Sequence, residues 1–245
     1  MKNIMIVGAT SAVAQAVSRL YAKEHASFFL IARNAARLES VAKDLRVLGA
    51  KSVETNVCDL NDLSKHAALV AQAKQALGQI DLCLVAHGYL GDQKKSESNF
   101  QDAKLVIDTN FTGPASLLTA VAIELEAQRS GTIAALSSPA GDRGRYSNYV
   151  YGSAKGALTI FLSGLRARLS HHGVQVVTIK LGFVDSPMTA DFKKGPLWIT
   201  PDKLAPKIVR AIDSKRDVTY LPWFWALIML VFKLMPERIF KRMKF

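Results

Sequence analysis

The stretch Asn3-Ile-Met-Ile-Val-Gly-Ala-Thr-Ser-Ala-Val-Ala14 decides the fold, because it joins an apolar strand to a helix through Gly8. The helix is predicted over residues 12–24, and the same order of strand and helix recurs along the chain. Further strands are predicted at 27–31, 52–56, 80–86, 132–136, 174–180 and 218–220, and further helices near 34–48, 61–77, 97–128, 148–172 and 201–213. Short strands separated by helices predict an α/β fold with one doubly wound parallel sheet of seven strands and helices on both faces.

Composition and charge narrow the class of protein. Of the 245 residues, 49% are hydrophobic, and no signal peptide precedes the first predicted strand, so we expect a cytoplasmic body. Cys58 and Cys83 lie in apolar runs without metal-ligand spacing and are predicted to be buried free thiols, and no metal site is expected. The net charge is +12 without a nucleic-acid-binding motif. This charge favours an anionic cofactor, an anionic substrate and an anionic membrane surface as partners.

A candidate catalytic pair lies in Tyr149-Val-Tyr-Gly-Ser-Ala-Lys155. Tyr151 and Lys155 are one helical turn apart and therefore project from the same face. We expect the ammonium to stabilise the phenolate and to lower a tyrosine pKa that is otherwise near ~10. Such a tyrosine exchanges a proton with a carbonyl or alcohol oxygen. The alternative is a solvated helix face, in which this spacing is also common.

Two further motifs make the resemblance to a known family specific. Asn110 lies in Asp108-Thr-Asn-Phe-Thr-Gly113, and Ser138 lies in Leu136-Ser-Ser-Pro139. With Tyr151 and Lys155 they resemble the Asn-Ser-Tyr-Lys tetrad of the short-chain dehydrogenase/reductase family, whose Rossmann-type fold binds NAD(P)(H). The resemblance implies that Tyr151 donates a proton to the substrate oxygen and that Ser138 hydrogen-bonds this oxygen. It also implies that Lys155 holds the nicotinamide ribose and that Asn110 holds a water linked to Lys155. Ser137 is expected to point into packing.

The phosphate-binding turn departs from the pattern of the family. Of its three glycines only Gly8 is present, and Ala12 and Ala14 replace the other two. Thr10 and Ser11 are expected to cap the following helix and to offer hydroxyls to phosphate. The cofactor-binding residues implied by the resemblance are Gly8, Thr10, Ser11, Val13, Arg33, Asp59, Leu60, Ala86, Gly88, Tyr151, Lys155, Val184 and Ser186.

The end of the second strand bears on the choice of cofactor. NAD enzymes usually place a carboxylate there, whereas this chain has Ala32-Arg33, with Arg37 one turn later. A guanidinium is available for a 2′-phosphate, so NADP(H) is favoured and NAD(H) remains the alternative. Asp59 matches the aspartate of the family that contacts adenine, and it also suits capping of the helix near Asn61. His87 is expected to be a structural histidine with a local hydrogen bond rather than a catalytic one.

The region after the sixth strand, Leu181-Gly-Phe-Val-Asp-Ser-Pro-Met-Thr189, resembles the segment of the family that meets the nicotinamide. Val184 is expected to contact the carboxamide, and Ser186 the amide or the pyrophosphate. Residues of about 187–198 are expected to form a substrate lid. We divide the chain into a catalytic domain at 1–221, which includes the lid, and a C-terminal tail at 222–245.

The tail contains Trp223-Phe-Trp-Ala-Leu-Ile-Met-Leu-Val-Phe232, an apolar run too short to span a bilayer, which needs roughly 20 residues. Basic residues alternate with apolar ones beyond Pro236. This pattern predicts peripheral association with the inner face of the cytoplasmic membrane. The alternative is a subunit contact, because members of the family often form homo-oligomers.

Three stretches, at 86–92, 137–151 and 236–240, resemble short-chain reductases that act on a keto sugar carried by polyprenyl phosphate. The resemblance implies reduction of a 2′-keto group after a separate flavin-dependent oxidase has acted, as the reductive half of an epimerisation in the synthesis of cell-envelope polysaccharide. Arg143 and Arg145 are the candidates for the substrate phosphate, with a solvated loop as the alternative. The competing functions are a reductase of another keto-lipid or of a soluble ketone, and a noncatalytic NADPH-binding scaffold for a membrane oxidase.

Overall fold

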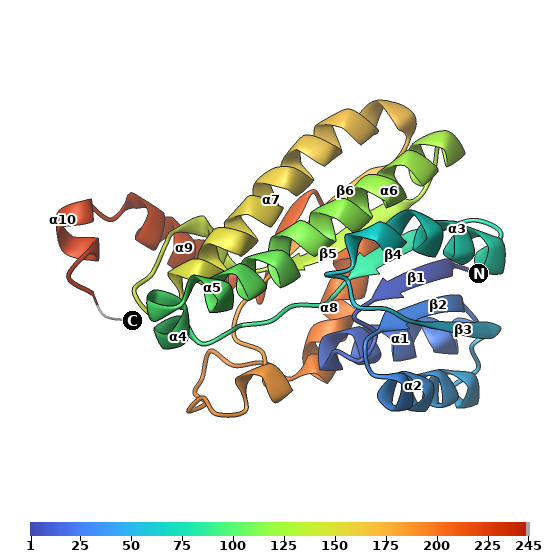
Figure 1. Ribbon diagram of the computed structural model, residues 1–245, viewed down its shortest axis with the longest axis horizontal. Coiled ribbons are helices and arrows are strands. Elements are labelled where there is room, and N and C mark those ends of the chain that lie inside the picture. The colour runs from blue at the N-terminus through green and yellow to red at the C-terminus, as the bar shows by residue number, and fades with distance from the viewer. Residues whose placement is uncertain (244–245) are drawn as a thin grey trace.

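A computed structural model of the chain describes residues 1–243 (Figure 1). Seven parallel strands form one sheet in the order β3-β2-β1-β4-β5-β6-β7. The predicted doubly wound α/β fold is thereby confirmed, with strand ends that differ by one or two residues from the prediction. The strands are β1 (Asn3–Val7), β2 (Ser27–Ala32), β3 (Ser52–Val57), β4 (Leu82–Val85), β5 (Thr132–Ser137), β6 (Gln175–Leu181) and β7 (Val218–Leu221).

Helices cover both faces of the sheet (Figure 1). One face carries α1 (Ala12–Lys23), α2 (Ala35–Val47) and α8 (Pro201–Asp213), and the other carries α3 (His66–Leu77), α6 (Gly113–Gln128) and α7 (Tyr149–Leu169). Strand residues alternate between the two cores: Ile4 and Ile6 pack into the first, and Met5 and Val7 into the second. Short 3-10 turns occupy Leu63–Lys65, Pro139–Asp142, Ser170–His172 and Pro187–Thr189. Cys58 and Cys83 are buried free thiols, as predicted.

The single helix predicted over 97–128 is wrong. The structure has α4 (Gln93–Ser98), α5 (Phe100–Ile107), a π-helical turn at Asp108–Thr112, and then α6. Asn99 separates α4 from α5 because its backbone is extended and its side chain accepts a 3.0 Å hydrogen bond from the Gln101 amide. The π-helical turn adds one residue to the helical repeat, and such turns are frequent at functional sites. Here it carries Asn110.

The C-terminal segment folds onto the body of the molecule as α9 (Phe224–Leu234) and α10 (Glu237–Phe240). Trp225 and Met229 are buried on the inner side of α9, whereas its outer side is exposed. Within residues 1–243, none of the helices combines the length and apolar character that crossing a bilayer requires. The last two residues of the predicted tail, 244–245, lie outside the described residues.

Candidate active site

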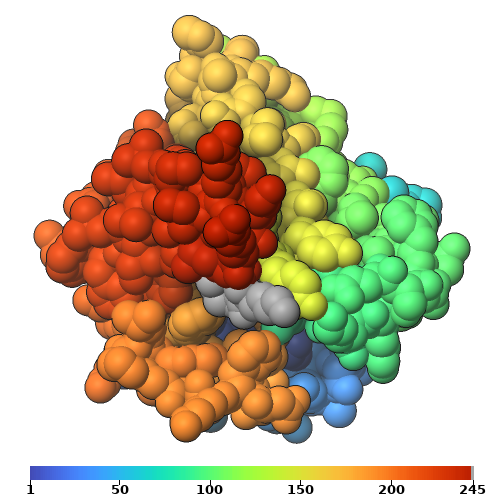
Figure 2. Space-filling model, turned by 90° about the vertical axis from the view of Figure 1, so that its left-hand side faces the viewer, coloured from blue at the N-terminus to red at the C-terminus, as the bar shows by residue number. Residues whose placement is uncertain are grey.

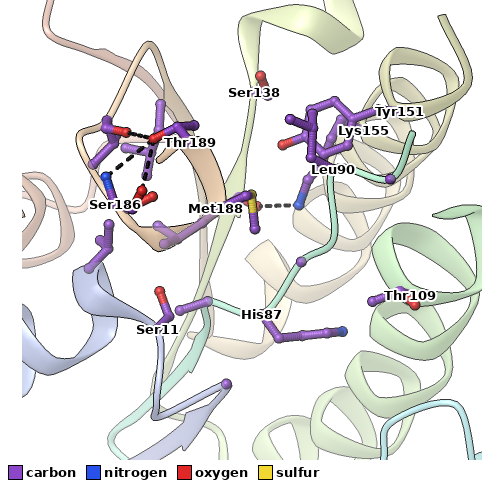
Figure 3. A pocket seen from close by; sticks show the side chains of 18 of the residues that line it. Ser11, His87, Leu90, Thr109, Ser138, Tyr151, Lys155, Ser186, Met188 and Thr189 are labelled. Carbon is purple, nitrogen blue, oxygen red and sulfur yellow. Dashed lines mark hydrogen bonds between the residues drawn. The ribbon is translucent and has the colours of Figure 1, made fainter. Parts of the chain in front are cut away.

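One cavity of about 690 Å³ opens at the carboxyl ends of the strands, where the sequence predicted a site. It is lined from the ends of β1, β2, β4, β5 and β6 and from α7, the lid and α9. Figure 3 shows Ser138, Tyr151 and Lys155 together on one side, with Ser186 and Thr189 on the other. Met188 extends from the lid toward Lys155.

Ser138, Tyr151 and Lys155 are brought together by the packing of the β5 turn on α7. Lys155 Nζ donates a 3.0 Å hydrogen bond to the Leu136 carbonyl and lies 5.9 Å from the centre of the Tyr151 ring. The turn after Ser138 approaches α7 so closely that a Cβ on Gly141 would lie 2.5 Å from the Gly156 nitrogen. Only glycine permits this approach. Gly141 therefore lets the turn that begins at Ser138 pack directly on α7, beside Lys155.

The two neighbouring serines have different surroundings. The buried Ser137 hydroxyl lies 2.8 Å from Thr159 Oγ1 and donates to the Lys155 carbonyl at 3.3 Å. The Ser138 hydroxyl accepts a 3.1 Å hydrogen bond from the Ala140 amide and lines the cavity. Ser137 therefore points into packing, as expected, and Ser138 is the serine beside Tyr151.

Burial, rather than the lysine, dominates the electrostatics of Tyr151. Burial raises the pKa of Tyr151 to about 12, against lowering effects of the Ser138 hydrogen bond and the Arg145 charge. Burial also lowers the pKa of Lys155 to about 8. The expected lowering of the tyrosine pKa by Lys155 is thus wrong for this structure, because desolvation disfavours both charged forms. At neutral pH the phenol holds its proton, which suits a proton donor.

Asn110 acts on the backbone that follows β4. Its side-chain amide donates to the carbonyls of Tyr89 (2.6 Å) and Val106 (2.8 Å), and its oxygen accepts from the Tyr89 amide (3.2 Å). A Cβ on Gly88 would lie 3.0 Å from the Asn110 oxygen and 3.6 Å from Lys155 Nζ. Asn110 therefore fixes the loop through Gly88 against Lys155. The water-holding role implied by the resemblance stays a prediction.

The cofactor half of the cavity is formed by the first βα turn. Gly8 has φ +78°, and a Cβ there would lie 2.5 Å from the His87 nitrogen, so glycine is required. Ser11 occupies the N-cap position of α1, but its side chain makes no capping hydrogen bond, contrary to expectation. Among residues 1–243 the Thr10 hydroxyl makes no hydrogen bond, so Thr10 does not cap either; its carbonyl accepts a 3.0 Å hydrogen bond from Gln15 Nε2. The first amides of α1 therefore stay uncapped beside a cavity that Thr10, Ser11 and Val13 line, which fits a pyrophosphate.

Arg33 and Asp59 lie at the adenosine end. Arg33 Nη1 is 3.9 Å from Asp59 Oδ2, and the arginine side chain is 65% exposed, so this pair leaves the guanidinium accessible. Asp59 Oδ1 accepts a 3.0 Å hydrogen bond from the Asn61 amide, which closes a turn ahead of the 3-10 turn at Leu63–Lys65. The N-cap residue of that turn is Asp62, so the expected capping by Asp59 is wrong. Arg37, Leu60, Ala86 and Gly88 also line the cavity.

His87 departs from the expectation of a local hydrogen bond. In Figure 3 the His87 ring extends toward Thr109. The Thr109 backbone raises the pKa of His87, but the contact does not have the geometry of a hydrogen bond. Within residues 1–243 both buried ring nitrogens lack a hydrogen-bond partner. Burial, with a smaller contribution from the Lys155 charge, lowers the pKa of His87 to about 3. The imidazole is therefore neutral, in agreement with a structural histidine and not with a proton donor at neutral pH.

The predicted lid is tied at both ends. The Thr189 hydroxyl donates to the Val184 carbonyl at 2.6 Å and accepts from the Ser186 amide at 3.2 Å. At the other end Val184 forms a parallel bridge with Ile199, and Trp198 stacks on Phe183 with ring centres 5.2 Å apart. Val184 and Ser186 line the cavity. Their contacts with the nicotinamide stay a prediction.

The structure separates the two arginines that were expected to bind a phosphate. Arg143 is turned away from the cavity: it donates to the carbonyls of Phe232 and Met235 (2.6 Å), pairs with Glu237 (2.7 Å) and lies 3.8 Å above the Phe240 ring. Its role as a phosphate ligand is therefore wrong, because these contacts use the guanidinium to fasten α9 and α10. Arg145 lines the cavity.

The lining residues that were not found from the sequence include Gln93, Asn148 and Trp225. Asn148 directly precedes α7, a position where asparagine is common as a cap, and that signal could have identified it. Trp225 and Met229 are spaced for one helix face, but the all-apolar run hid which side faces inward.

Comparison with known proteins gives the family. Residues 2–196 match the short chain dehydrogenase family, and the chain belongs to it. An uncharacterized oxidoreductase of Mycobacterium tuberculosis is 35% identical over 240 residues, covering 98% of this chain and 96% of the relative. One of Streptomyces coelicolor is 33% identical over 243 residues, covering 99% and 96%. An actinorhodin polyketide ketoreductase variant solved with NADPH has the same fold, with a TM-score of 0.77 at 22% identity over 86% of this chain and 90% of that one.

The chain is therefore an oxidoreductase, and its family implies an NAD(P)(H) cofactor. Three features of this chain suit an NAD(P)(H) cofactor. They are the uncapped start of α1, the required Gly8 and the accessible Arg33.

Proposed function

We propose that the protein reduces a ketone to a secondary alcohol with NADPH, on a keto sugar carried by a polyprenyl phosphate. The observation that carries the reductase proposal is the convergence of Ser138, Tyr151 and Lys155 on one cavity that also contains the uncapped start of α1.

The residues divide the work on the reacting oxygen. A reduced nicotinamide supplies hydride when it is bound. Tyr151 donates its proton to the carbonyl oxygen as negative charge develops there, and its raised pKa keeps that proton in place beforehand. Ser138 donates a hydrogen bond to the same oxygen. Lys155 holds positive charge beside this pair.

Arg33 and Arg37 support NADP(H) over NAD(H). Both line the adenosine end of the cavity, where a 2′-phosphate would find two cations. Asp59 is the carboxylate nearest to Arg33 there, and at 3.9 Å their pairing is weak and solvent-exposed.

Resemblance supports the substrate. The stretches at 86–92, 137–151 and 236–240 are similar to the reductase subunit of decaprenylphosphoryl-ribose 2′-epimerase, in which a separate flavin oxidase makes the 2′-keto sugar. In this chain the cavity combines Arg145 with aromatic side chains of the lid and α9, namely Phe192, Trp198 and Trp225. A cation beside aromatic surface suits a ligand with both a phosphate and a lipid. A flavin-dependent oxidase is accordingly the proposed partner.

The test is turnover with defined ketones. We expect the protein to oxidise NADPH with a 2′-keto-ribosyl polyprenyl phosphate, to bind NADPH more tightly than NADH, and to form the arabino product. Equal or faster turnover of a soluble ketone without phosphate would redirect the proposal to a general ketone reductase. NADPH binding without reduction of any ketone would contradict the enzymatic function and favour a scaffold.

We further propose that the outer side of α9 docks on an anionic membrane surface. Trp223, Leu227, Leu230, Val231 and Leu234 are between 52% and 74% exposed, although the helix is also apolar on its inner side. A helix that is apolar all round is normally covered. Exposed Lys233, Arg238, Lys241 and Arg242 flank this side, which favours anionic lipid as the cover. In Figure 2 this segment (red) shares one face with the lid (orange) and residues near 145 (yellow).

Substitutions on the outer side of α9 test the docking without disturbing the cavity. Deletion of residues 222–245 would also remove Trp225, which lines the site. We therefore use point substitutions in place of a deletion. Together, Leu227→Ser, Leu230→Ser and Leu234→Ser are expected to reduce sedimentation with vesicles of anionic phospholipid by about tenfold or more, because each removes an apolar side chain that the membrane would bury. NADPH binding should persist.

The matched control is Ile123→Ser with Ile160→Ser, which removes exposed apolar side chains from α6 and α7. Equal sedimentation of all three proteins would contradict membrane docking. A change from oligomer to monomer in the α9 variant alone would assign this side to a subunit contact instead.

A further inference from the structure

Three polar side chains meet in the substrate half of the cavity with hydrogen-bonding atoms that have no partner. Gln93 is in α4, whereas Arg145 and Asn148 are in the loop that precedes α7. Gln93 Nε2, Arg145 Nε and Asn148 Oδ1 are buried, and within residues 1–243 none of these atoms makes a hydrogen bond. A buried polar atom without a partner costs free energy, so such atoms grouped in one cavity indicate a missing ligand.

Arg145 gives this group its charge. Across the described part of the chain, its guanidinium has neither a hydrogen bond nor an ion pair. Burial lowers the pKa of Arg145, against the raising effects of Tyr151 and Asp142. Arg143, two residues earlier, is instead fully engaged by α9 and α10. One arginine thus anchors the loop, and the other presents an unpaired cation to the cavity.

Gln93 frees the side chain of Asn148. Asn148 stands at the N-cap of α7, where asparagine usually accepts a hydrogen bond from an amide of the first turn, but it makes no such bond. Gln93 Oε1 accepts from the Val150 amide at 3.2 Å instead. This bond fixes the orientation of the Gln93 amide, so its Nε2 is a donor with no partner and Asn148 Oδ1 is a spare acceptor.

We propose that Gln93, Arg145 and Asn148 form a subsite for a polyhydroxylated anion, with Arg145 on a phosphate and the two amides on sugar hydroxyls. The inference rests on the proposed function, because it assigns the polar end of that substrate. The apolar end then lies against Phe192, Trp198 and Trp225, which line the same cavity. Arg145 and Tyr151 line the same cavity, and the Arg145 charge acts on the Tyr151 pKa, so the anion lies in the cavity that holds the reacting carbonyl.

Binding of small sugars tests the subsite independently of turnover. The probes are ribose 5-phosphate and ribose, titrated calorimetrically into the NADPH-saturated protein. We expect Arg145→Gln to weaken binding of ribose 5-phosphate by roughly tenfold to a hundredfold and binding of ribose by less than about threefold, since only the phosphate needs the charge. Asn148→Ala should weaken both probes to a similar extent.

Two variants complete the design. Gln93→Glu keeps an oxygen for the Val150 amide but replaces the donor with a negative charge. The substitution should therefore weaken binding of ribose 5-phosphate more than it weakens binding of ribose. Arg19→Gln removes the same charge from the outer side of α1, where Arg19 pairs with Asp44, and should change neither affinity. Unfolding temperature and NADPH affinity report whether each variant is folded.

Unchanged phosphate affinity in folded Arg145→Gln, or equal loss in Arg19→Gln, would overturn the subsite. If NADPH-dependent ketone reduction persists in that case, the proposed function stands without it. If phosphate binding depends on Arg145 but no ketone is reduced, the subsite is supported and the proposed function is contradicted.

Discussion

Replacing Tyr151 by phenylalanine is expected to lower kcat for ketone reduction by about 10²–10⁴-fold, the range that a positioned general acid contributes. The phenol is buried beside Ser138 and Arg145, and it holds its proton at neutral pH because burial raises its pKa to about 12. Phenylalanine keeps the ring and its packing but has no proton to donate. The measurement is NADPH oxidation under saturating ketone, together with NADPH affinity, which should change by less than about threefold.

Tyr149 provides the matched control for this substitution. It lies two residues earlier in the same helix, is 42% exposed and does not line the cavity. Tyr149→Phe should therefore retain nearly all activity. A Tyr151→Phe protein that keeps more than about one tenth of the activity would show that another group supplies the proton, since Tyr151 is the only member of the trio with that role.

The sheet could be predicted because each strand has a local signal. In a short apolar strand such as Ile4 to Val7, successive side chains pack into the cores on the two faces of the sheet. Each such run is followed by a helical segment. Helix boundaries were less predictable where the stop is a single side chain. Asn99 ends α4 and caps α5, and α4 itself (Gln93–Ser98) has no apolar residue whose periodicity could have marked it.

The catalytic trio could also be predicted, because Ser138, Tyr151 and Lys155 are close in sequence and at fixed spacing. Contacts between distant residues could not. Arg143 meets α9 and α10 across 89 to 94 residues, and nothing local distinguishes it from Arg145. The sign of the Tyr151 pKa shift was missed for a related reason: spacing reveals the neighbouring lysine, whereas desolvation depends on everything packed around the ring.

A buried ion pair connects the catalytic turn to the far edge of the sheet. Asp142, four residues after Ser138, accepts from Lys180 in β6 and from the Tyr220 hydroxyl in β7 at 2.6 Å. Burial and the Asp142 hydrogen bond raise the pKa of Tyr220, so it remains a neutral donor. The side chains of Lys180 and Asp142 are 8% and 5% exposed, so neither charge is compensated by water. The pair therefore fixes the end of the turn that carries Ser138.

Asp142→Asn is expected to lower the free energy of unfolding by about 3–5 kcal/mol, because it leaves the Lys180 charge buried without a counter-charge. In a chain of this size that corresponds to a fall in Tm of roughly 6–20 °C, measured by thermal unfolding. Glu39→Gln, which breaks the exposed pair with Arg46, should shift Tm by less than about 4 °C. The double variant Asp142→Asn with Lys180→Met should regain most of the loss, since the penalty comes from the isolated charge and not from the missing bond. If the double variant were less stable than Asp142→Asn alone, the contribution of Lys180 would be its packing and hydrogen bonds, and the charge argument would be wrong.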